Sequence, residues 1–310
     1  MTAHGHGHHG HGHGVSADAS VGWLALALAI NLVFMVVEVV AGLLADSLAL
    51  LSDAAHMLTD VAAIALALVA VRLAQRPPAG AFTFGLKRSE ILSAQINGAA
   101  LLLLAGFIAF EAIGRLGSTP EVDGPFVIVV GLAGAAANGG AAWALSRANR
   151  RSLNIEGAYL HNLADLFSSL AAAVAGAVIL FTGFDEADSI AALLVAALML
   201  RGGASLLIDS GRVLLEAAPR GMDASEIGQA MARREGIVEV HDLHVWEVTS
   251  GFPALSAHVL VAAGDDCHAR RRELQTLLRE RFGITHTTLQ VDHEHQKGLV
   301  ALQMPGESPS

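Results

Sequence analysis

Residues 48–73 read LALLSDAAHMLTDVAAIALALVAVRL, a run of Ala, Leu and Val whose first half is interrupted by Asp53, His56 and Asp60. The run is long enough to cross a hydrocarbon core of about 30 Å, which takes about 20 helical residues. A carboxylate at bilayer depth costs about 3 kcal/mol on insertion scales, so a partner or ligand must offset that cost. The stretch therefore predicts a membrane-spanning helix whose polar residues need a partner.

The composition extends this prediction to most of the chain. Of 310 residues, 53% are hydrophobic and 15% are charged, a balance too apolar for an ordinary soluble protein. The apolar runs of spanning length are residues 21–44, 48–73, 91–113, 126–146, 158–181 and 189–208. The sequence therefore predicts an α-helical membrane protein with six transmembrane helices over residues 21–208.

Residues 209–295 have the pattern of a small domain outside the membrane. Asp223, with Glu226 three residues later, predicts a helix N-cap and capping box. The elements expected here are a helix to about residue 234, strands over 237–248 and 254–262, a helix over 265–281 and a strand over 285–292. This αββαβ order predicts a ferredoxin-like α+β domain. We expect residues 1–20, which are rich in histidine, and the tail 296–310 to be disordered.

The charges between the spans predict the orientation in the membrane. Basic residues gather in the loops after the second and fourth spans: Arg72, Arg76, Lys87, Arg88, Arg147, Arg150 and Arg151. By the positive-inside rule, both termini and the C-terminal domain are cytoplasmic. The net charge of −10 argues against a nucleic-acid partner. A single cysteine, Cys267, excludes a disulfide framework. The N-terminus has no Lys or Arg before the first span, which argues against a cleaved signal peptide.

The chain has 15 histidines, and their positions form three groups. The two in apolar spans are His56 and His161. The group at the N-terminus is His4, His6, His8, His9, His11 and His13. The group in the last quarter is His241, His244, His258, His268, His286, His293 and His295. Alternation with glycine gives the N-terminal group no fixed geometry, which predicts a flexible, low-affinity collector of metal.

Two spans contain the same motif, His-x-x-x-Asp, at His56 with Asp60 and at His161 with Asp165. Residues i and i+4 share one face of an α-helix, so each pair forms a two-toothed clamp. Two facing clamps offer two imidazoles and two carboxylates, a complete tetrahedral set for Zn²⁺. Asp53, one turn before His56, is either a proton relay or a polar group in helix packing.

Several separated motifs resemble the cation diffusion facilitator family, specifically its zinc-transporting branch. They are residues 38–60, 84–92, 157–161, 214–219 and 241–246. The resemblance implies a homodimeric exporter in the cell's inner (plasma) membrane that exchanges cytoplasmic divalent metal for protons. It places the transport ligands at His56, Asp60, His161 and Asp165, with Zn²⁺ as substrate and Cd²⁺ or Co²⁺ as alternatives. It also implies that the chain is not an enzyme.

The resemblance implies regulatory metal ligands in the cytoplasmic domain at His241, His258, His268 and Asp292. Dinuclear members have a histidine two residues before that aspartate, where this chain has Gln290. We expect His286, on the same strand face, to be able to replace the missing ligand.

Strand alternation predicts that His244 and Trp246 face away from His241, as structural or dimer-interface residues. Some members have histidines around a Phe-Gly in the loop between the second and third spans. Here residues 81–85 read AFTFG and offer no ligand, so we expect no metal site there.

Two other classes of protein also fit a metal site in a membrane. An intramembrane hydrolase needs an open coordination position for water and a general base, whereas four ligands would close this site and leave Asp53 as a spare. A metal sensor that does not transport is the other alternative. Proton-coupled flux in liposomes separates both from an exporter.

Overall fold

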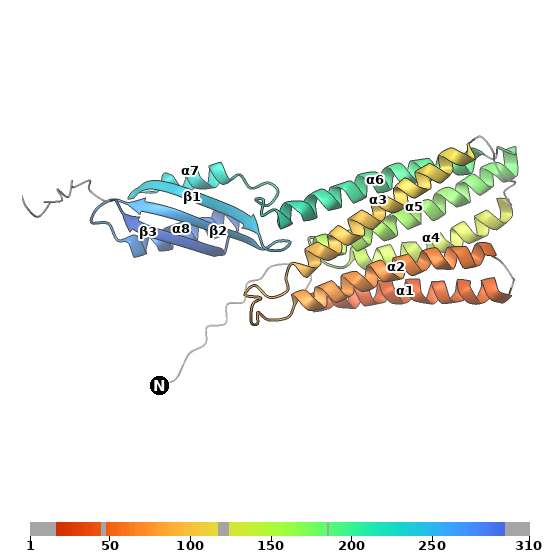
Figure 1. The fold of residues 1–310 in the computed structure, drawn as a ribbon, viewed down its shortest axis with the longest axis horizontal. Helices are drawn as coiled ribbons and strands as arrows, with labels where there is room; N and C mark the ends of the chain where they lie inside the picture. The colour runs from red at the N-terminus through yellow and green to blue at the C-terminus, as the bar shows by residue number, and fades with distance from the viewer. Residues whose placement is uncertain (1–16, 45–47, 117–123, 185, 295–310) are drawn as a thin grey trace, which may run out of the picture. The chain divides into compact units, whose positions relative to one another are not determined.

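The computed structural model describes residues 17–44, 48–116, 124–184 and 186–294 (Figure 1). Within these ranges, only the backbone is described at residues 17, 18, 38, 41, 42, 48–56, 59, 124, 126 and 188. The chain divides into two compact units, one reaching Leu214 and including Thr249–Gly251, the other holding Leu215–Val248 and the residues from Phe252 onward.

The first unit is a bundle of long apolar helices. Its described helices are α1 (Ala17–Leu44), α2 (Leu48–Ala74), α3 (Ser89–Arg115), α4 (Gly124–Ser146), α5 (Leu153–Thr182) and α6 (Glu186–Leu214). Five of them, all except α2, contain a described segment long and apolar enough to cross a membrane. The remaining predicted span, residues 48–73, coincides with α2, part of whose side chains are not described. The helical membrane fold is therefore confirmed.

The bundle is held by neighbouring helices packed along their length. In this packing α1 lies along α2, α3 along α6, and α4 along α5 (Figure 1). One apolar core joins α1, α2, α4 and α5 through residues such as Leu24, Ile64 and Leu145, all fully buried. A smaller core around Leu101 joins α3 to α5 and α6. The helix α5 belongs to both cores and is the central element of the bundle.

Glycines let two of these helix pairs approach closely. A Cβ added at Gly131 in α4 would lie 2.7 Å from the backbone oxygen of Ser169 in α5. A Cβ added at Gly203 in α6 would lie 3.0 Å from the backbone oxygen of Gly98 in α3. Lipid gives helices little hydrophobic reason to associate, so small residues that allow backbone contact become a main source of packing energy.

The second unit is a three-stranded sheet with helices on one face. Its elements are α7 (Ala224–Ala232), β1 (Ile237–Glu247), β2 (Pro253–Val261), α8 (Cys267–Phe282) and β3 (His286–His293). The strand order is β1-β2-β3, with β1 antiparallel and β3 parallel to β2. The predicted αββαβ order is confirmed, and side chains from α7, α8 and one sheet face form a separate apolar core around Ile227, Leu255 and Leu274.

The helix starts of this domain follow their sequence signals. Asp223 caps α7 by accepting a hydrogen bond from the Ser225 N–H, as predicted. Glu226 accepts a hydrogen bond from Arg281 of α8, so its carboxylate links the two helices. Asp266 caps α8, and the N–H groups of Ala269 and His268 hold the pKa of its carboxyl below the usual range.

One strand prediction was wrong. His241 pairs with His258 and His244 pairs with Ser256, so three steps along β1 match two steps along β2. The extra residue is a β-bulge, which shifts the alternation of all later residues by one position. His244 and Trp246, which pair with Ser256 and Ala254, therefore lie on the same sheet face as His241 rather than on the opposite one.

The close contact at Gly131 predicts a difference between two glycines of α4. Gly131→Ala must push α4 and α5 apart, whereas a Cβ at Gly140 would be 3.8 Å from the nearest atoms, those of Ile30. Both changes raise helix propensity by about 1 kcal/mol, so their difference isolates the contact. We expect Gly131→Ala to lower the Tm of the detergent-solubilised protein and Gly140→Ala to leave it unchanged or higher. Equal shifts in the two variants would contradict this packing.

Candidate metal centre

One face of α5 carries polar residues deep inside the bundle. Asn154, His161, Asn162 and Asp165 are all buried among alanines and apolar side chains. Separations of four, seven and eight residues are close to one or two whole helical turns, so these side chains lie on one side of the helix. Lipid tails offer these side chains no hydrogen-bond partners, so this face of α5 has to meet polar groups on neighbouring helices.

Two asparagines fix how α5 sits against its neighbours. Asn154 Nδ2 donates a hydrogen bond of 2.8 Å to the backbone oxygen of Ala67 in α2. Asn31 Nδ2 of α1 donates a hydrogen bond of 3.0 Å to Asn162 Oδ1. Because Asn162 follows His161 directly in the chain, these contacts set the rotation of α5 at the point where the imidazole emerges.

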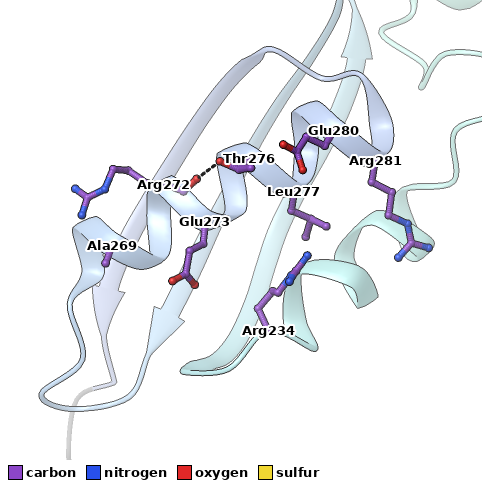
Figure 2. Close-up of a pocket in the computed structure, with 8 residues that line it drawn as sticks. All are labelled: Arg234, Ala269, Arg272, Glu273, Thr276, Leu277, Glu280 and Arg281. Atoms are coloured by element: carbon purple, nitrogen blue, oxygen red, sulfur yellow. Dashed lines mark hydrogen bonds between the residues drawn. The ribbon is translucent and has the colours of Figure 1, made fainter.

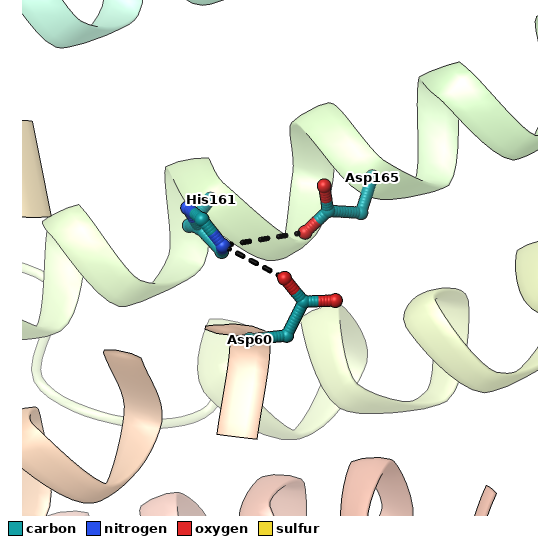
Figure 3. A group of neighbouring side chains, drawn as sticks. All are labelled: Asp60, His161 and Asp165. Atoms are coloured by element: carbon teal, nitrogen blue, oxygen red, sulfur yellow. Dashed lines mark hydrogen bonds and ion pairs between the residues drawn. The ribbon is translucent and has the colours of Figure 1, made fainter. Parts of the chain in front are cut away.

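The polar face of α5 meets one carboxylate of α2. His161 Nε2 lies 2.9 Å from Asp60 Oδ1 and 3.7 Å from Asp165 Oδ2 (Figure 3). Figure 3 shows the imidazole turned toward both carboxylates, one from its own helix and one from α2. One ligand atom from each residue lies within 4.8 Å of the other two. The three side chains thus converge on a point between the two helices.

The cluster is sealed from solvent. Asp60 is 0% exposed, His161 is 3% exposed and Asp165 is 4% exposed. Burying two carboxylates away from water costs free energy unless a proton or a cation compensates their charge. One imidazole and two carboxylates are hard and borderline donors of the kind that bind Zn²⁺ and related divalent ions. The arrangement can therefore hold either a divalent cation or protons, and it cannot hold both at full occupancy.

The structure brings together three of the four predicted transport residues. The fourth, His56, lies in α2 four residues before Asp60, and its side chain lies outside the described residues, as does that of Asp53. The six histidines from His4 to His13 also fall outside the described part of the chain. Their roles stay predictions.

Sequence reasoning missed Asn154 and Asn162 as parts of this site. Both lie on the same face of α5 as His161, and that helical spacing was the available signal. Their partners could not be read from the sequence, because Asn162 bonds a residue 131 positions away and Asn154 bonds a backbone oxygen.

In the C-terminal domain, two of the predicted metal ligands are neighbours. His241 of β1 and His258 of β2 are paired across the hairpin, with ring centroids 5.4 Å apart. Asp292 of β3 pairs with Leu260, and its carboxylate accepts a hydrogen bond of 2.9 Å from Gln290 Nε2. The residue that replaces the family's histidine thus holds the nearby carboxylate itself.

The structure does not bring the remaining predicted ligands to this pair. His286 pairs with Ala254 at the start of β3, edge-on to Phe252, whereas His258 pairs with Gln290. Four residues along a strand span about 13 Å, which is too far for His286 to replace a ligand at Gln290. His268 lies exposed in the first turn of α8.

A hollow of about 750 Å³ lies between α8 and the end of α7 (Figure 2). Figure 2 shows its arginines pointing in different directions, and Arg281 is engaged by Glu226. The side chains do not converge on a common point, so this hollow is a weaker candidate site than the buried cluster. Its lining residues are Arg234, Ala269, Arg272, Glu273, Thr276, Leu277, Glu280 and Arg281.

Comparison with known proteins follows the division of the chain. Residues 24–215 match the family model described as the cation efflux transmembrane domain. Residues 219–294 match the model described as the cation efflux protein, cytoplasmic domain. Together the two models cover both units of the structure.

Two curated relatives are similar over most of their length. The "Cadmium, cobalt and zinc/H(+)-K(+) antiporter" of Bacillus subtilis is 38% identical, over 86% of this chain and 88% of that protein. The "Zinc transporter ZitB" of Escherichia coli is 38% identical, over 84% of each chain. A solved structure, the metal-bound C-terminal domain of the CzcD transporter from Cupriavidus metallidurans, is 32% identical and covers 23% of this chain and 97% of that chain, with a TM-score of 0.22.

The match to the transmembrane model and these relatives confirm the family that the sequence motifs indicated. They also agree with the prediction that the chain is not an enzyme, because the relatives are named as transporters and antiporters. The chain belongs to the cation efflux family, also called the cation diffusion facilitators, a family of membrane transporters that move metal cations.

Proposed function

We propose that this protein exports divalent metal, Zn²⁺ above all, from the cytoplasm in exchange for protons. The observation that carries the proposal is the buried cluster of Asp60, His161 and Asp165 between α2 and α5. The names of these relatives, which include zinc, cadmium, cobalt and H⁺, support this choice of substrate and of exchange ion.

The transport site consists of these three residues and His56. A tetrahedral zinc site with ligands at 2.0–2.1 Å has neighbouring ligand atoms about 3.3 Å apart. The separations of 2.9 Å and 3.7 Å around His161 Nε2 bracket that value, so small side-chain movements suffice for binding. His56, one turn before Asp60 on α2, is the proposed fourth ligand, with Asp53 as a proton relay.

Exchange with protons follows from competition for the same atoms. Zn²⁺ binds neutral imidazole and ionised carboxylate, so its entry must displace the protons that the cluster holds. In the metal-free cluster, His161 lies between two carboxylates and can keep them close by carrying a proton. When the site opens to the other side, protons return and release the metal. Such a carrier alternates between two arrangements of α2 and α5 against the other helices.

The proposal includes a homodimer in the inner membrane with both termini in the cytoplasm. The basic residues in the loops after α2 and α4 support this orientation. Residues 219–294 match the cytoplasmic-domain model of the cation efflux proteins, whose short name, ZT_dimer, refers to a dimer, and this supports dimerisation through the C-terminal domain. Metal bound there would bias the two transport states by its different affinity for each. The regulatory ligands proposed on the resemblance are His241, His258, His268 and Asp292, and the N-terminal histidines act as a low-affinity collector.

Loss of one carboxylate from the cluster should stop transport. In liposomes with an internal zinc dye and an imposed pH gradient, we expect Asp165→Asn to reduce zinc flux by at least about tenfold, because a direct ligand should cost no less than an outer-shell partner. Glu111→Gln is the matched control, since that carboxylate of α3 is exposed and paired with Arg115. Normal flux in Asp165→Asn would refute the proposed site. A zinc sensor that does not transport would give no flux even in the wild type.

Zinc binding should release protons from the cluster. In weakly buffered, mildly acidic detergent solution, adding Zn²⁺ to the wild type should release more protons per chain than adding it to His161→Ala. The other histidines are common to both proteins, so a pH-sensitive dye measures the contribution of the cluster as the difference. Equal proton release from the two proteins would show that metal and protons do not compete at His161.

A further inference from the structure

One asparagine of the bundle is buried with an idle side-chain oxygen. Asn138 of α4 is 3% exposed, and its Oδ1 has no hydrogen-bond partner among the residues that the structure describes. Asparagines inside membrane bundles usually join helices by hydrogen bonds, as Asn31 and Asn162 do here. A buried amide that lacks such a bond costs free energy that a bonded one recovers. Asn138 therefore needs an explanation other than helix association in this arrangement.

The contacts between α4 and α5 fix the level of each residue along this helix pair. A Cβ added at Gly134 would lie 2.9 Å from Ser169 Oγ, and one added at Gly139 would lie 3.7 Å from a methyl carbon of Leu166. Later residues of α4 thus meet earlier residues of α5, so the two helices are antiparallel. The glycines also bring the helices close enough for short side chains to reach across the interface.

This pairing puts Asn138 opposite Asp165. Asn138 is one turn after Gly134, and Asp165 is one turn before Ser169, so both lie at the same level on faces that meet. The other polar groups of α5 near this level are already engaged. Asn162 is bonded through both its side-chain oxygen and its nitrogen, and the Ser169 hydroxyl donates to a backbone oxygen of its own helix. The carboxylate of Asp165 is therefore the group of α5 that the amide can meet.

We propose that Asn138 is a positioning residue of the transport site, whose amide holds the carboxylate of Asp165 when that carboxylate binds metal. Asp165 Oδ2 lies 3.7 Å from His161 Nε2 in the structure. When one oxygen of Asp165 turns to a metal ion, the other oxygen needs a hydrogen-bond donor to hold the ligand in place. Rotation about the last side-chain bond of Asn138 exchanges Oδ1 and Nδ2, so the amide can present an N–H at that point. The inference rests on the proposed transport function.

A partner that the amide gains only in the metal-bound arrangement would favour that arrangement. A hydrogen bond to an ionised carboxylate is among the stronger kinds, and it would offset the cost of burying the amide. It would also tie α4 to α5 at a residue that binds the metal. A contact made in one state of a carrier and absent in the other is the differential interaction through which a bound ion shifts the balance of states.

Stability and zinc use should respond in different ways to loss of this amide. Asn138→Leu removes the amide and keeps a side chain of similar size. In detergent with a chelator, we expect its Tm to equal or exceed that of the wild type, because no hydrogen bond is lost. In the liposome assay with an internal zinc dye, the zinc concentration for half-maximal flux should rise at least about tenfold, as for the loss of other outer-shell partners. Asn138→Ala, which cannot overpack the interface, should raise it as well.

Asn97→Leu is the matched control. Asn97 of α3 is 2% exposed, and its Nδ2 has no hydrogen-bond partner within the described part of the chain. Its side chain lies over Gly157, where a Cβ would be 3.8 Å from that nitrogen, rather than opposite Asp165. We expect Asn97→Leu to reach half-maximal flux at the same zinc concentration as the wild type.

An unchanged zinc requirement in both Asn138 variants would overturn the proposal. An equal rise in Asn97→Leu would overturn it too, because loss of any buried amide would then have this effect. A rise that follows the loss of Tm across the two Asn138 variants would assign Asn138 to packing instead. Asp165→Asn, measured in parallel, tests the transport site itself. Normal flux there refutes the proposed function, whereas its loss together with normal zinc use in the Asn138 variants refutes only this inference.

Discussion

Burial of ionisable groups between α2 and α5 is the constraint on which the arrangement of the bundle depends. Asp60, His161 and Asp165 are almost fully enclosed, and each needs the other two to offset the loss of water. The two helices must therefore lie within reach of an imidazole ring. The hydrogen bond from Asn154 to the backbone of α2 and the pair formed by Asn31 and Asn162 hold α5 in the required position.

Close packing of the other helices through small residues stabilises the bundle around that position. The helix α4 approaches α5 at Gly131, and α6 approaches α3 at Gly203, so that backbones are in contact where larger side chains would separate them. Apolar side chains cannot drive this association in lipid as they do in water. A bundle held by short-range contacts and a few polar bonds can also change between two arrangements, which a carrier requires.

The C-terminal domain is stabilised differently from the bundle, because one face of its sheet is buried against helices and the other is exposed. Its core lies between the sheet and the helices α7 and α8, and the open face carries His241, His244 and His258. These exposed histidines contribute little to folding, so strand register rather than burial decides where they stand. The bulge between His241 and His244 is the feature that sets this register.

The sequence by itself determined what depends on local periodicity. The apolar runs predicted the helices, the i, i+4 spacing put His161 and Asp165 on one face, and the cap at Asp223 marked the start of α7. The tertiary structure alone decided which groups from distant segments meet: Asp60 with His161, and Asn31 with Asn162. It also decided the face of His244, because a bulge forms only when two strands pair, and a period-two pattern in one strand cannot reveal an extra residue.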